Sequence, residues 1–133
     1  MTDDGFVITL HERERVLEVQ YPARVSLSEF EKYEVEMRAL IEKLERGGPW
    51  HCLVDQSRVV TTMPPDLPPR IAELVAWSHD HGMDRVGRVV SASELGRLQA
   101  TRMLRAAGVA DLAMLFQDRA SAWAFVTGSK LDS

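Results

Sequence analysis

The chain has 133 residues, of which 27% are charged and 45% hydrophobic, and a formal net charge of −4. This length supports one domain around a single core, and the negative balance argues against a general nucleic-acid-binding protein, which normally carries a basic stripe. The single cysteine, Cys52, excludes an internal disulfide and favours a reducing, cytoplasmic location. The acidic amino-terminal residues do not resemble a secretory signal, and no apolar run is long enough to span a membrane.

The amino-terminal part predicts a hairpin followed by a helix. Residues 6–10 and 16–21 are β-rich runs separated by a charged turn, a pattern typical of an antiparallel hairpin. Apolar residues recur at helical spacing between Leu27 and Arg46, and Ser26 or Ser28 can accept the free N–H groups of the first turn. This pattern predicts one helix with a single apolar face.

The remaining chain alternates predicted strands and helices. The first of these strands begins with an almost unbroken apolar run, which is typical of a central strand covered on both faces. The predicted ranges are a strand from His51 to about Val60, a helix at 68–81, a strand at 86–90, a helix at 93–107, a strand at 112–116 and a helix at 119–126.

The resulting order, ββαβαβαβα, predicts an α/β fold. After the hairpin each strand is followed by a helix, so the later strands should be parallel and joined by right-handed crossovers. We therefore expect one domain with a mixed sheet of about five strands, flanked by helices.

Three stretches in this order resemble the STAS domain superfamily, and within it the SpoIIAA-like branch. They are the strand end Leu53-Val-Asp-Gln-Ser57, the amphipathic helix 27–46 entered from the hairpin, and the segment Phe116-Gln-Asp-Arg-Ala-Ser-Ala-Trp123. The resemblance implies a non-catalytic protein-interaction module in bacterial regulation. Its partner would bind the loop 57–67 and the helix that follows.

The chain departs from that family at the site where anti-anti-sigma factors are phosphorylated. Where those relatives carry an acidic residue followed by Ser-Ser-Gly, this chain has Met63, Pro64 and Pro65. The nearest hydroxyls belong to Thr61 and Thr62, which lack the surrounding motif. We therefore expect no phosphorylation switch at the usual site.

The polar residues that end the strand from His51 are the first candidate site. Asp55 and Ser57 lie where open α/β sheets usually bind their ligands, although short polar side chains also commonly bond to the turn that follows them. The adjoining segment with Thr61, Thr62 and Met63 is a candidate contact surface, because loops at such an edge are exposed.

Trp77 supports a second function hypothesis. Together with Met63 and Met83 it could line an apolar cavity, or it could pack against the neighbouring helix. SpoIIAA-like proteins resemble lipid-transfer domains in fold, so the alternative function is a carrier or sensor of a small apolar ligand. A homodimer that buries the helical face around Trp77 is a further possibility.

No residue set predicts an enzyme, a metal site or a cofactor. His79 and His81 are two residues apart on a predicted helix, so they point to different sides and cannot share one ion. Arg97, Thr101 and Arg105 recur along one helix, with Arg102 close by and Arg88 on the preceding strand; they could bind an anion or form an ordinary solvated surface.

Overall fold

The computed structural model describes residues 5–59, 63–91 and 94–128, and of residues 94–96 it describes the backbone alone. The chain folds into a five-stranded mixed sheet with four helices, as the sequence predicts. No helix in these ranges is long and apolar enough to cross a membrane.

The strands lie side by side in the same order as in the sequence. The first two strands form the antiparallel hairpin, and every later strand pairs in parallel with the one before it. The carboxyl ends of four parallel strands therefore meet at one edge of the sheet. The strands are β1 (Val7–His11), β2 (Val16–Gln20), β3 (Trp50–Asp55), β4 (Met83–Val89) and β5 (Ala113–Phe116).

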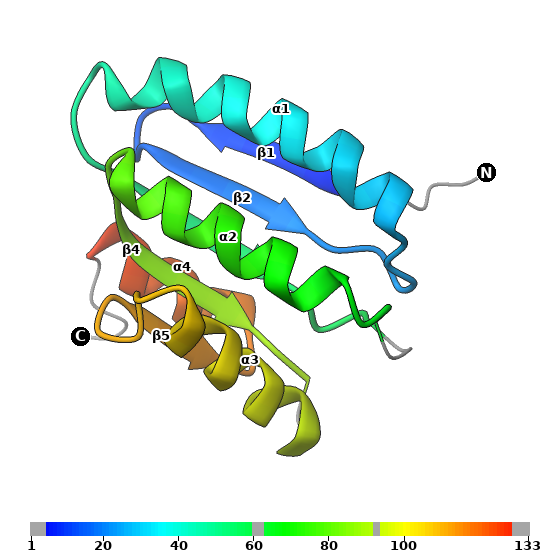
Figure 1. Cartoon of the computed structure of the whole chain (residues 1–133). Coiled ribbons are helices and arrows are strands. Elements are labelled where there is room, and N and C mark those ends of the chain that lie inside the picture. The colour runs from blue at the N-terminus through cyan, green and yellow to red at the C-terminus, as the bar shows by residue number, and fades with distance from the viewer. Residues whose placement is uncertain (1–4, 60–62, 92–93, 129–133) are drawn as a thin grey trace.

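Three helices cover one face of the sheet and the fourth covers the other (Figure 1). The shared face carries α1 (Leu27–Glu45), α2 (Leu67–Asp80) and α3 (Glu94–Ala106), with α2 between the other two. The opposite face carries α4 (Arg119–Thr127). The central strands are covered on both faces, which explains the apolar run at the start of β3.

The core has two parts, one on each face of the sheet. The larger part packs apolar residues of the sheet against α1, α2 and α3, while α4 buries Ala122 and Val126 against the back. Gly87 lets α4 approach β4 closely, since a Cβ there would lie 3.2 Å from Val126 Cγ1. Side chains alternate along a strand, so the next residue, Arg88, points to the face that carries α2 and α3.

Side-chain caps begin two of the helices, and the first of them is one that the sequence predicts. Ser26 Oγ accepts a hydrogen bond from the N–H of Glu29 at 3.2 Å, which selects Ser26 rather than Ser28 as the cap of α1. Asp118 Oδ1 accepts one from the N–H of Ser121 at 2.8 Å and begins α4.

Two strand boundaries differ from the prediction by more than one residue. β3 ends at Asp55 instead of continuing towards Val60, because the Asp55 side chain accepts bonds from the turn that follows. β4 begins at Met83, earlier than predicted, because Met83 pairs with Trp50 and the Trp50 indole N–H donates to the carbonyl of His81 at 2.9 Å. These tertiary contacts extend a strand that local apolar content alone does not reveal.

Candidate functional site

A pocket of about 410 Å³ opens between α2, α3 and the carboxyl edge of the sheet. This volume lies in the lower part of the range that small-molecule sites occupy, roughly 300–1,000 Å³. Its walls are mainly apolar and come from both helices and from the segment before α2. The apolar lining includes Met63, Ile71, Ala72, Ala100, Met103 and Ala106.

The floor of the pocket comes from three neighbouring parallel strands. Tyr21 directly follows β2, Gln56 directly follows β3, and Arg88 is the penultimate residue of β4. The backbone holds them in place, since the N–H of Tyr21 donates to the carbonyl of Asp55, and the N–H of Gln56 to that of Val89, both at 2.9 Å. Backbone hydrogen bonds that continue beyond the strand ends thus bring three polar side chains together at the floor of the pocket.

Arg88 is the most unusual residue of this floor. Only 1% of its surface is exposed, although a guanidinium keeps its charge at every physiological pH. Its Nη1 donates to Oε1 of Gln56 at 2.7 Å, while its Nε is buried and has no hydrogen-bond partner. Among the side chains that the structure describes, no carboxylate forms an ion pair with Arg88.

Two buried ionisable groups that interact electrostatically with Arg88, Tyr33 and Cys52, remain neutral. Burial raises the pKa of the Tyr33 phenol well above its usual range, and burial raises the pKa of the Cys52 thiol to about 12. The positive charge of Arg88 opposes both shifts but does not overcome them. Neither group is therefore an anion that could balance Arg88 at neutral pH. Cys52 is also buried, as its apolar strand predicts.

The rim of the pocket is exposed and mostly neutral. Pro68 and Pro69 lie in the first turn of α2, where a missing N–H breaks no intrahelical bond, and Gln99 and Arg102 face them from α3. All four rim residues are solvent-exposed, while Arg88 lies at the buried end. The pocket therefore leads from an open rim, between apolar walls, to a cation.

The predicted site residues near the carboxyl end of β3 do not share one environment. Asp55 and Ser57 bond to each other, because Asp55 Oδ1 accepts from the N–H of Ser57 at 2.9 Å and from its hydroxyl at 2.6 Å. This is the turn-forming alternative that the sequence left open. Met63 lines the pocket, whereas Thr61 and Thr62 lie outside the described residues.

Trp77 lies at the contact between α1 and α2 and is not one of the described pocket residues. The Arg38 guanidinium lies 4.6 Å from the Trp77 ring centroid, and the centroid of the His81 ring lies 4.0 Å from it. Trp77 therefore packs against its neighbours, which is one of the two alternatives that the sequence left open. Met83 is buried in the core instead of lining this pocket. The structure therefore does not gather Trp77, Met63 and Met83 into one cavity.

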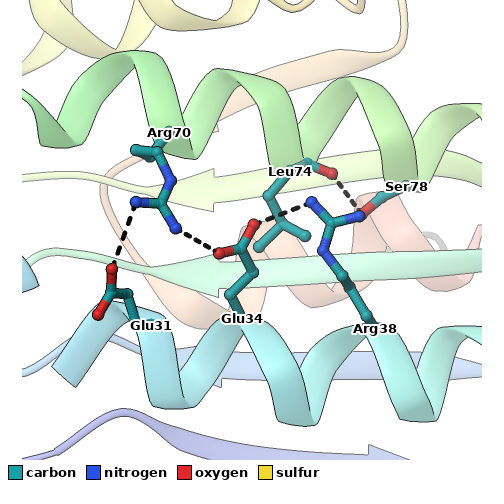
Figure 2. A network of polar contacts seen from close by, with 6 residues as sticks. All are labelled: Glu31, Glu34, Arg38, Arg70, Leu74 and Ser78. Carbon is teal, nitrogen blue, oxygen red and sulfur yellow. Dashed lines mark hydrogen bonds and ion pairs between the residues drawn. The ribbon is translucent and has the colours of Figure 1, made fainter. Parts of the chain in front are cut away.

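An ion-pair network ties α2 to α1 (Figure 2). Glu34 accepts from Arg70 at 2.8 Å and from Arg38 at 2.9 Å, and Arg70 also lies 3.6 Å from Glu31. On α2 itself, the Ser78 hydroxyl donates to the carbonyl of Leu74 at 2.7 Å. These contacts hold the helix whose first turns form one wall of the pocket.

His79 on α2 and His81, which directly follows α2, bond to different groups. His81 Nδ1 lies 2.8 Å from a Glu45 carboxylate oxygen, and His79 Nδ1 lies 3.2 Å from the carbonyl of Met83. Within the described ranges, no three His, Cys, Asp or Glu side chains are placed to hold a metal ion.

The arginines of α3 do not form one site. Arg97 and Arg105 are exposed, and the Thr101 hydroxyl bonds to the carbonyl of Arg97 at 2.9 Å. Of the five residues that the sequence groups together, Arg88 lines the pocket at its floor and Arg102 lines it at the rim.

Sequence reasoning missed Gln56 as a site residue and treated Arg88 only as a neighbour of the α3 arginines. One signal was present: a charged residue inside the apolar strand Val86–Val90 is expensive to bury and therefore calls for a partner. No protein-family model, curated protein or solved structure matches the chain. The STAS resemblance accordingly stays a prediction.

Proposed function

We propose that this protein binds a small, largely apolar ligand in the pocket between α2 and α3. The observation that carries the proposal is the pocket itself, whose apolar walls enclose about 410 Å³ at the carboxyl edge of parallel strands. Ligand sites of α/β proteins usually lie at this edge, and they combine apolar walls with a few convergent polar groups. The proposed role is a carrier or sensor without catalysis.

The convergence of polar groups supports this role further. Arg88 lies on a strand, and Tyr21 and Gln56 directly follow two others, where backbone hydrogen bonds to Asp55 and Val89 fix their positions. A rigid floor reduces the entropy that a ligand must offset on binding.

A second candidate is the regulatory protein-interaction module implied by the STAS resemblance. Its expected surface is the loop 57–67 with α2, and of the described residues of that surface Met63, Pro68 and Pro69 line the same pocket with accessible apolar side chains. Apolar side chains on an exposed rim suit a partner as well as a ligand.

Native mass spectrometry of the purified protein tests the first proposal directly. We expect a co-purifying molecule of low mass, or saturable one-to-one binding of a neutral solvatochromic dye to the emptied protein. The dye should be displaced by decanol. A clean protein mass together with no saturable dye binding would refute ligand binding and leave the interaction module as the better candidate.

A further inference from the structure

We infer that the ligand is a monocarboxylic amphiphile whose carboxylate pairs with Arg88 while its hydrocarbon part lies between α2 and α3. This inference rests on the proposed ligand-binding function and adds the chemical class of the ligand. It follows from the coincidence of a buried, incompletely bonded cation with an apolar pocket.

The charge balance at the floor calls for an anion. Burying a guanidinium costs several kcal/mol unless the cation is paired and hydrogen-bonded. Gln56 supplies a neutral acceptor to Nη1, and Nε remains without a partner. In the part of the chain whose side chains are described, no carboxylate pairs with this cation, so a ligand carboxylate would supply the missing charge.

The geometry of the donor group favours a carboxylate. A guanidinium presents its N–H groups as a planar fork that matches the two oxygens of a carboxylate, and the unpartnered Nε is one of the donors of that fork. A single carboxylate charge balances the single charge of Arg88. A phosphate dianion would leave one negative charge uncompensated in the same buried place.

The remaining pocket surface favours a hydrocarbon chain. Between the floor and the rim the walls present Ile71, Ala72, Ala100 and Met103, which offer no charge to a second polar group. Methionine adapts its shape readily, so Met63 and Met103 can pack against a flexible chain. The head group therefore binds at the buried end and the chain points towards the rim.

The inference is tested with three probes that share one hydrocarbon chain: decanoate, decanol and decylamine. Displacement of the neutral dye from the wild-type protein should rank decanoate first by about tenfold over decanol, as one charged hydrogen-bonded pair would provide. Decylamine should bind most weakly, because its ammonium would face Arg88.

Substitution of the cation separates the head group from the chain. Arg88→Met should remove the preference for decanoate and leave decanol binding within about threefold, and Arg88→Lys should retain part of the preference. Arg105→Gln, which removes an exposed charge from α3, serves as the matched control and should keep the full preference. Circular dichroism verifies that each variant folds, and the wild-type ranking decides the question if Arg88→Met does not.

The outcomes distinguish the two proposals. Dye and decanol binding without any preference for decanoate would overturn the carboxylate inference and leave the proposed function intact. A preference that survives in folded Arg88→Met would also overturn the inference. No binding of the dye or of any probe would overturn the proposed function itself.

Discussion

Nη1 of Arg88 donates a hydrogen bond to Oε1 of Gln56 across 2.7 Å, and this contact joins the carboxyl ends of two neighbouring parallel strands. Gln56 is partly buried and Arg88 is buried almost completely. The acceptor therefore contributes to solvating a cation that is almost completely buried. The same contact leaves the guanidinium at the floor of the pocket.

Replacing Gln56 with leucine should destabilise the fold. Loss of the amide oxygen leaves a buried charged donor without this acceptor, so the free energy of unfolding should fall by about 1–3 kcal/mol. Urea denaturation measures the change, and Gln117→Leu is the matched control at an exposed position, with an expected effect below about 0.5 kcal/mol. Equal stability of the two variants would contradict the structural role assigned to Gln56.

Narrowing the pocket should weaken ligand binding without unfolding the protein. Ala106 ends α3 and lines the pocket but is exposed, so Ala106→Trp adds a large ring to the pocket wall and leaves the core intact. Dye binding should weaken at least about tenfold, since a small ligand gains its affinity from burial in such a pocket. Ala120→Trp places the same ring at an exposed position of α4, on the opposite face of the sheet. This variant should bind the dye like the wild type.

Cys52 should react with a thiol reagent only when the protein unfolds. The side chain is buried on β3, and burial raises the pKa of its thiol to about 12, so almost none of it is thiolate at about pH 8. A chromogenic disulfide should therefore react slowly with the native protein and completely in urea. Rapid stoichiometric reaction under native conditions would show that β3 is more accessible than the structure has it.

Glu18 should make stability depend on pH in the acidic range. Arg119 Nε lies 2.6 Å from one carboxylate oxygen and His11 Nε2 lies 2.8 Å from the other. The hydrogen bond from Arg119 is the main cause that lowers the pKa of Glu18, against an opposing effect of burial. The unfolded chain then binds this proton more readily than the folded one, so the contribution to stability is complete above the ordinary glutamate pKa of about 4.3 and is lost as the pH falls below it.

The comparison between two variants measures this effect. Thermal melts between about pH 6 and pH 3 should show a smaller loss of stability in Glu18→Gln than in the wild type, because that variant lacks the titrating group. Glu36→Gln, at an exposed position of α1, should follow the wild-type curve. Identical curves for all three proteins would show that Glu18 does not contribute to the loss of stability at acidic pH.

Much of the fold is predictable because its signals are local. The apolar spacing of α1, the serine and aspartate caps at Ser26 and Asp118, and the glycines after the helices act within a few residues of where they stand. The strand boundaries were less predictable, because the start of β4 depends on its pairing with Trp50, far away in the sequence.

The location of the candidate site was predictable only in part. The carboxyl end of β3 follows from the element order, and the sequence pointed there. The particular residues did not follow from it: Asp55 and Ser57 bond to each other, and Trp77 packs between α1 and α2. The residues that reach the pocket are their neighbour Gln56 and the distant Arg88.

By itself, the sequence determined the α/β class, the order of elements and the edge of the sheet at which polar residues gather, because hydrophobic period, caps and turn residues are properties of adjacent positions. Only the tertiary structure decided which side chains share a cavity. That depends on strand register and on the face each residue takes, and it brings together Gln56 and Arg88, which lie 32 positions apart in the chain. A buried arginine costs free energy in any fold, but its partner and the pocket beside it exist only once the strands are paired.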